Sequence, residues 1–232
     1  MAMVKTPEEI SIMKRAAEAT QSVFARVLEH IRAGATERRI ANKMEAFAME
    51  IPGVSSLAFP TIIASGPNGA QPHAEITDRI FEAGDFVTVD FGVTLEGYAG
   101  DMTRTFILGA PTSKQRGIYE SVQRSQAAGL AAAKGGMACA ELDAICRDLI
   151  REDGYGDYFI HTTGHGVGTE VHEGPRIKNG SKTILEPGMV VTIEPGIYIE
   201  GFGGVRIEDT VLITETGCEV LTPLISKELL EL

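Results

Sequence analysis

Cysteine and positive charge are both scarce in this chain of 232 residues. It has three cysteines, Cys139, Cys146 and Cys218, and no C-x-x-C pair, which indicates reduced thiols and not a disulfide framework. Lysine and arginine number 21 against 32 acidic residues, so the net charge is −11. This balance argues against a nucleic-acid-binding protein, because such proteins normally carry a basic stripe.

Long apolar runs are also missing. The N-terminal segment MAMVKTPEEI is not followed by the apolar region of a signal peptide, and no apolar run approaches membrane-spanning length. The composition, 44% hydrophobic and 23% charged, is ordinary for a globular protein of this size. We therefore expect a cytoplasmic protein that binds neither nucleic acid nor membrane.

The first half of the chain begins with two helix patterns. Thr6 is expected to cap a long helix, with Pro7 at the first helical position and Glu9 completing a capping box. Thr36 is expected to cap a shorter helix that runs to about Glu50. Strand-like segments follow, in FPTIIAS, DFVTVDFGV and DMTRTFILG.

The same order then repeats. Ser113 is expected to cap a long helix that ends at Gly135 and Gly136, and a shorter helix ends at Gly154. After them come the strand-like segments VVTIEPGIYI and GVRIEDTVLIT.

This repetition predicts an α+β fold with an internal pseudo-twofold duplication. No segment of linker composition separates the two halves. We expect one domain over residues 1–232, with duplicated halves of roughly 6–110 and 113–225.

Two apolar strands carry an acid at matching positions. GDFVTVDFG (84–92) and GMVVTIEPG (188–196) align without a gap and place Asp90 on Glu194. A carboxylate in an apolar strand is costly unless something neutralises it. Taken singly, Asp90 is more typical of a cap or turn residue, but two matched acids can converge on one cation.

Each half has a second acid shortly downstream. These are Asp101 in GYAGDMTRTF and Glu208 in GVRIEDTVLIT. Alone, Asp101 is interpreted as a turn residue and Glu208 as an exposed strand acid. Four acids in paired positions carry too much negative charge to lie together without divalent metal.

The histidines supply the remaining ligand. His30 lies on the first helix and is interpreted as structural, whereas His73 follows Pro72 and three more lie in HTTGHGVGTEVHEGP. The glycines around His165 allow close backbone approach. One imidazole with carboxylates suits manganese, cobalt, iron or zinc. Two acids from each half and one histidine therefore predict a site for two metal ions roughly 3.5–4 Å apart.

These motifs resemble those of the pita-bread metallopeptidases, which include methionine aminopeptidases, Xaa-Pro aminopeptidases and Xaa-Pro dipeptidases. The resemblance extends from KTPEEI to GCEVLTPL and rests on VDFG, GYAGDMTRTF, GHGVGTEVHEGP, TIEPGIYI and GVRIEDTVLIT. It implies the pita-bread fold and two divalent ions, with manganese favoured over cobalt, zinc or iron. It also implies the metal ligands Asp90, Asp101, His165, Glu194 and Glu208, of which Glu208 would bridge both ions.

The resemblance also assigns roles around the scissile bond. It implies substrate binding by His73, His161, His172 and Arg206, and catalytic roles for the three histidines and for Glu194. His161 matches a position typical of the proline-specific branch. Pro72 before His73 and Arg206 before Glu208 favour the same branch.

The expected function is that of a dinuclear-metal exopeptidase. It would hydrolyse the N-terminal bond of Xaa-Pro peptides or dipeptides through a metal-bridging hydroxide. A methionine aminopeptidase is the alternative, and a metal-free binding module of the same fold is less favoured because none of the five ligands is missing. Xaa-Pro peptidases of this fold usually carry an additional N-terminal domain, so a compact enzyme and the catalytic portion of a longer one both stay open. The native metal, the preferred peptide length and a homodimeric assembly also stay open.

Overall fold

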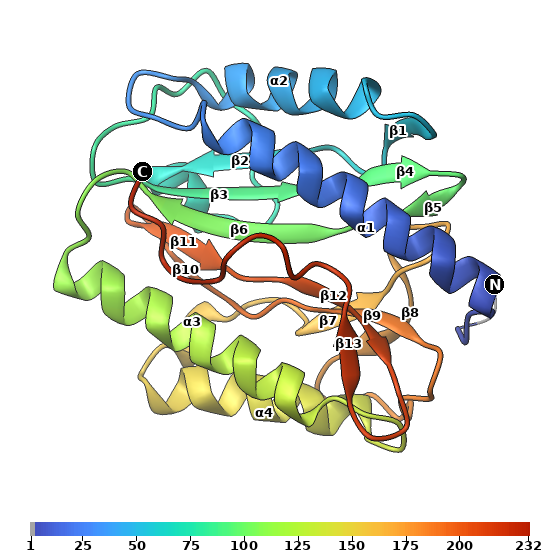
Figure 1. Ribbon diagram of the computed structural model, residues 1–232. Helices are drawn as coiled ribbons and strands as arrows, with labels where there is room; N and C mark the ends of the chain where they lie inside the picture. The colour runs from blue at the N-terminus through green and yellow to red at the C-terminus, as the bar shows by residue number, and fades with distance from the viewer. Residues whose placement is uncertain (1–2) are drawn as a thin grey trace.

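The computed structural model describes residues 3–232, so the first two residues of the expected domain lie outside the described part. Pairs of helices cover the strands from two sides (Figure 1). The helices are α1 (Pro7–Leu28), α2 (Glu37–Met49), α3 (Ser113–Ala132) and α4 (Cys139–Glu152). Within residues 3–232, no helix is both long and apolar enough to cross a membrane.

The strands follow each helix pair. After α2 come β1 (Val54–Leu57), β2 (Ile62–Ser65), β3 (Phe86–Phe91), β4 (Val93–Leu95), β5 (Tyr98–Ala99) and β6 (Met102–Ile107), with the short helix η1 (Gly66–Ala70) after β2. After α4 come η2 (Gly156–Tyr158), β7 (Gly164–Gly166), β8 (Glu173–Ile177), β9 (Val190–Ile193), β10 (Gly196–Ile199), β11 (Gly203–Arg206), β12 (Asp209–Ile213) and β13 (Cys218–Val220).

Two antiparallel sheets carry the acidic strands. One has the order β2-β3-β6 and the other has the order β13-β12-β9-β7-β8. Smaller sheets, β1-β4-β5 and β10-β11, extend from them. Asp90 lies on β3, whose neighbour β6 begins directly after Asp101. Glu194 directly follows β9, whose neighbour β12 begins directly after Glu208.

The backbone repeats as well as the element order. The aligned glycines Gly84 and Gly188 have φ angles of 89° and 91°, a left-handed conformation that favours glycine. Each stands shortly before an acidic strand. The expected internal duplication is therefore visible in matching turns and in matching strand pairs, while the exact limits of the two halves remain a prediction.

Side chains at the helix starts explain where the helices begin. The Thr6 and Glu9 capping box is confirmed, and Thr36 caps α2 as expected. The prediction that Ser113 caps α3 is wrong. Thr112 is the cap, because its hydroxyl accepts from the backbone N–H of Gln115 while the Gln115 side chain accepts from the Thr112 N–H at 2.9 Å.

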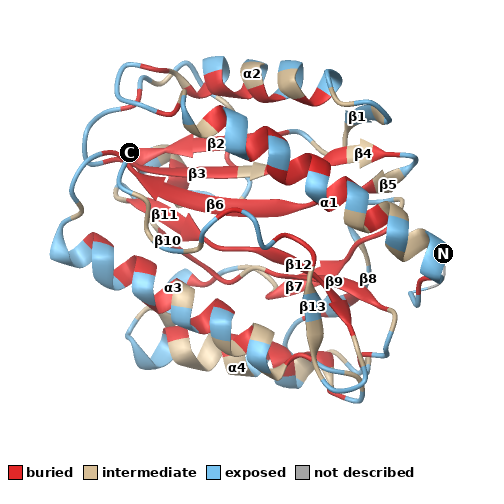
Figure 2. Ribbon diagram, viewed as in Figure 1, coloured by how far each residue is buried: buried red, intermediate tan, exposed pale blue. Residues whose placement is uncertain are grey.

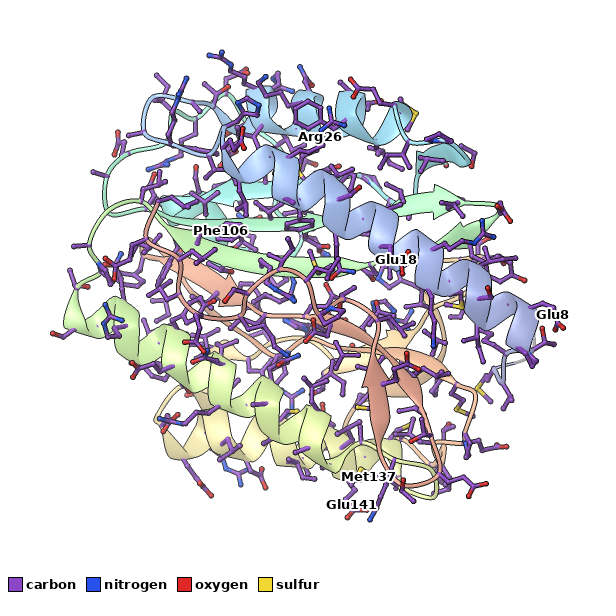
Figure 3. The ribbon with its side chains drawn as sticks, viewed as in Figure 1. Glu8, Glu18, Arg26, Phe106, Met137 and Glu141 are labelled. Carbon is purple, nitrogen blue, oxygen red and sulfur yellow. The ribbon has the colours of Figure 1, made fainter. Side chains whose placement is uncertain are left out.

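The core lies between the helix pairs and the sheets. One apolar cluster includes Phe24 of α1, Met44 of α2 and Phe106 of β6. A second includes Leu142 of α4 and Val191 of β9. Figure 2 shows this arrangement as buried inner faces on the helices and exposed outer faces. Figure 3 shows the exposed Glu8 and Glu18 along α1, with the buried Phe106 on the sheet below. The two sheets thus meet with their acidic strand ends inside the molecule.

Candidate metal centre

The structure brings the predicted ligands to one cavity of about 430 Å³. The cavity lining includes Asp90, Asp101, His165, Glu194 and Glu208. Ligand atoms of Asp101, His165 and Glu208 all lie within 4.8 Å of one another. His165 Nε2 is 3.2 Å from Glu194 Oε1 and 3.7 Å from Asp101 Oδ2. Strand ends from both sheets therefore place four carboxylates and one imidazole together.

Asp90 has one oxygen engaged and one without a partner. Its Oδ2 accepts from Arg206 Nη2 at 2.6 Å. Its Oδ1 is buried and has no hydrogen-bond partner among residues 3–232. A buried carboxylate oxygen without a partner is costly, and a cation would satisfy it. The donor set therefore fits divalent metal.

The electrostatics of the carboxylates point the same way. Burial raises the pKa of Asp90, and it raises the pKa of Asp101 and Glu208 well above the ordinary value, with neighbouring carboxylates adding to the rise. Burial also acts to raise the pKa of Glu194, but the hydrogen bond and charge of His165 outweigh it and lower the value to about 2. The raised pKa values of Asp90, Asp101 and Glu208 show that crowding these carboxylates together is unfavourable. A bound cation would offset this cost.

Two threonine hydroxyls orient the glutamates. Thr103 Oγ1 donates to Glu208 Oε2 at 2.6 Å. Thr192 Oγ1 donates to Glu194 Oε1 at 3.0 Å and accepts from the His165 N–H at 3.1 Å. Sequence reasoning missed both hydroxyls. The available signal was a polar residue inside the apolar strands MTRTFI and VVTI.

Tyr198 was also missed, and it connects two predicted residues. Arg206 Nη1 donates to the Tyr198 hydroxyl at 2.7 Å, and that hydroxyl lies 2.9 Å from His161 Nε2. His161 Nδ1 lies 2.7 Å from the Thr162 carbonyl oxygen. Because a carbonyl only accepts, Nδ1 carries the proton and Nε2 accepts from Tyr198. Both ring nitrogens of His161 are engaged in this arrangement.

Two of the remaining histidines line the cavity and one lies outside it. His73 and His172 line the cavity, and the ring of His172 packs on that of His165 with centroids 4.3 Å apart. Burial, with the nearby His165, lowers the pKa of His172 to about 4, so it is neutral at neutral pH. His30 lies in the turn that follows α1, not on the helix as expected. It packs against Phe47 and is not among the residues that line the cavity.

Residues 11–215 match metallopeptidase family M24. The chain belongs to this family. Membership implies divalent metal ions, and the carboxylate and histidine cluster is a suitable site for them.

Relatives are similar over nearly the whole chain. The Xaa-Pro dipeptidase of Pyrococcus furiosus is 50% identical over 220 residues, which are 95% of this chain and 63% of that protein. The structure of an Xaa-Pro dipeptidase from Bacillus anthracis has a TM-score of 0.97 at 46% identity, over 99% of this chain and 64% of that one. An X-Pro aminopeptidase from Thermotoga maritima has a TM-score of 0.95 at 40% identity, over 99% and 65%. This likeness confirms the predicted pita-bread fold, and the chain spans less than two thirds of each of these relatives.

Proposed function

We propose that this chain is a metal-dependent exopeptidase that cleaves the bond between the first residue and a following proline. The observation that carries the proposal is the cavity in which four carboxylates and His165 converge, with Asp90 Oδ1 left without a partner in the described residues. Membership of family M24 supports it, and so does the likeness to proteins named as Xaa-Pro dipeptidases and X-Pro aminopeptidases.

The metal would be held by five side chains. We infer two divalent ions on Asp90, Asp101, His165, Glu194 and Glu208, with manganese favoured over cobalt, zinc or iron because carboxylate oxygens dominate the donor set. When bound, such ions supply Lewis acidity and lower the pKa of water.

An exopeptidase acts next to the free α-amino group of its substrate. That group would lie in the cavity close to the carboxylates that would hold the metal ions. An internal peptide bond has no such group to place there.

The apolar part of the cavity lining suits a proline ring. A bond to proline has no N–H, and the pyrrolidine ring holds φ near −65°. Phe59, Ile62 and Val171 line the cavity and offer apolar surface to that ring. A site that requires no N–H donor from the second residue accepts proline where other peptidases reject it.

Proton transfer would involve Glu194 and His172. The departing nitrogen of proline is a secondary amine that must gain a proton. Glu194 and His172 both line the cavity, so either side chain would take a proton during attack and give it to the amine. His73 lies at the exposed side of the same cavity and would bind the substrate.

Arg206 uses most of its N–H groups for hydrogen bonds within the protein, which leaves little for a substrate. Its N–H groups donate to Asp90, Thr103, Tyr198 and the Pro72 carbonyl oxygen, and one of its five N–H groups has no partner among residues 3–232. Substrate binding by Arg206 stays a prediction that this single group would have to fulfil.

Three peptides test the proposal. The protein loaded with manganese or cobalt should cleave Ala-Pro, Ala-Pro-Ala or both, and leave Met-Ala-Ser nearly intact. Replacing His161→Ala should weaken cleavage before proline without emptying the metal centre, because His161 is not among the proposed ligands. Efficient cleavage of Met-Ala-Ser with no action on either proline peptide would contradict the proposal in favour of a methionine aminopeptidase.

A further inference from the structure

Glu37 is a fully buried carboxylate that lies outside the lining of the metal-centre cavity. It is the first residue of α2. Its Oε1 accepts from the Ser65 N–H and hydroxyl, both at 2.8 Å, and from Asn68 Nδ2 at 3.1 Å. Its Oε2 accepts from Asn68 Nδ2 at 3.0 Å, the Thr77 N–H at 2.9 Å and the Thr77 hydroxyl at 2.6 Å. Each oxygen thus accepts three hydrogen bonds, which offset the cost of burying the charge.

All these donors belong to one segment, residues 65–77, which we call the His73 loop. Ser65 ends β2, Asn68 lies in η1, and Thr77 lies beyond the residues that line the cavity. Asn68 also donates to the Glu75 carbonyl oxygen at 3.1 Å. Glu37 therefore ties both ends of the loop to each other and to the start of α2.

A second contact holds the other side of the loop. A Cβ built on Gly204 would lie 2.1 Å from the Gly69 carbonyl oxygen, so β11 and η1 approach closely through their backbones. Arg206 Nη1 also donates to the Pro72 carbonyl oxygen at 3.2 Å. The loop is thus fixed between Glu37 and the strand that leads to Glu208.

His73 depends on this loop for its position. It lines the cavity, but no hydrogen bond to its imidazole is found among residues 3–232. Without side-chain partners, the loop backbone is what sets the position of the His73 Cβ and therefore the part of the cavity that the ring can reach. A shift of about 1 Å in a positioned group can cost about 10²-fold in rate.

We propose that Glu37 is a positioning residue for His73, whose buried carboxylate fixes the His73 loop so that the imidazole faces the metal centre. This inference rests on the proposed function. A glutamine in its place would turn an amide N–H₂ toward Ser65 or Thr77. The hydroxyl at that end can accept instead of donate, but the backbone N–H beside it would lose its acceptor.

The test is a double-mutant cycle on cleavage of Ala-Pro or Ala-Pro-Ala, whichever the wild type cleaves faster. Glu37→Gln should lower kcat/KM about 10²-fold, while manganese affinity measured by calorimetry stays as in the wild type because no proposed ligand is touched. In a His73→Ala background the same substitution should cause little further loss. Glu45→Gln, at an exposed position of the same helix, is the matched control and should change neither quantity.

An equal loss from Glu37→Gln in both backgrounds would overturn the proposal, since the effect would not pass through His73. Wild-type kcat/KM in Glu37→Gln would overturn it too. If that variant does not fold, Thr77→Val takes its place, because it removes the 2.6 Å bond from an exposed residue. Its loss of kcat/KM must likewise disappear in the His73→Ala background.

A separate measurement distinguishes this inference from the proposed function. If the wild type cleaves none of the three peptides, the proposed function fails, and hydrogen exchange then tests the loop alone. Glu37→Gln, or Thr77→Val in its place, should speed exchange of the amides in residues 66–76 and leave those of α4 unchanged. Unchanged exchange in the loop would overturn the assignment of Glu37.

Discussion

Arg206 Nη2 lies 2.6 Å from Asp90 Oδ2, although 116 residues separate the two. The same guanidinium donates through Nε to Thr103 Oγ1 at 3.1 Å, and Thr103 in turn donates to Glu208 at 2.6 Å. One buried cation from the second half of the chain therefore orients proposed metal ligands on both sheets. It also leaves Asp90 Oδ1 as the oxygen available to metal.

Arg206→Lys should weaken manganese binding about 10–100-fold, the usual cost of losing a partner that orients a ligand. A lysine ammonium cannot reproduce the planar fork that reaches Asp90, Thr103 and Tyr198 at once. Calorimetric titration of the metal-free protein gives the affinity. Arg176→Lys is the control, because Arg176 also lines the cavity and should leave the affinity unchanged. Equal affinities in wild type and Arg206→Lys would refute this orienting role.

His161 should gain its proton only near about pH 4. Burial is the main cause of its lowered pKa, Arg206 and His73 act in the same direction, and Glu194 and the Thr162 carbonyl oppose them. The ordinary pKa of histidine is about 6.5, so between that pH and about 4 the unfolded chain binds a proton that the folded chain does not. This residue's contribution to stability therefore falls as the pH drops through that window.

NMR titration of the labelled His161 ring checks the prediction. No titration should be seen between pH 8 and pH 5, and the Nδ1–H tautomer should persist. Histidines of the urea-unfolded chain, which titrate near about 6.5, give the reference. A folded-state midpoint near that reference would show that the ring is not held as described.

Asp209→Asn should destabilise the fold strongly. Asp209 is buried and accepts from the buried Arg104 at 2.7 Å and from Gln126 and Lys227 at 2.8 Å each. Removing one partner of a buried ion pair leaves the other charge uncompensated, at a cost of about 3–5 kcal/mol. Urea unfolding of the two proteins measures the difference.

The matched control for that substitution is Glu231→Gln. It removes the exposed ion pair with Arg116 at 2.9 Å and should cost less than about 1 kcal/mol. Similar losses in the two variants would mean that the buried pair contributes no more than a surface one.

Local features of the fold were predictable because their signals lie close together in sequence. The capping box of Thr6 and Glu9 needs only four residues, and the matched acids stand out because carboxylates are rare in apolar strands. The start of α3 was predicted one residue late. Thr112 and Ser113 are adjacent hydroxyl residues, and only the reciprocal bonds to Gln115 decide between them.

Contacts between segments far apart in the chain could not be predicted from the sequence. Tyr198 looks like any aromatic residue of a strand until β10 places its hydroxyl between Arg206 and His161. Glu37 looks like an acid in the first turn of a helix, a common and usually exposed position. Its role depends on donors about thirty to forty residues further along the chain, which only the packing of the His73 loop against α2 brings near.

Metal binding by Asp101→Asn, compared with the wild type, decides whether the five side chains hold two metal ions. Both proteins are stripped with chelator, titrated with manganese by calorimetry, and checked for intact secondary structure by circular dichroism. We expect two ions bound per wild-type chain and the loss of most binding in the variant, with the fold retained. A wild-type chain that binds no divalent metal, or a variant that still binds two ions at wild-type affinity, would contradict it.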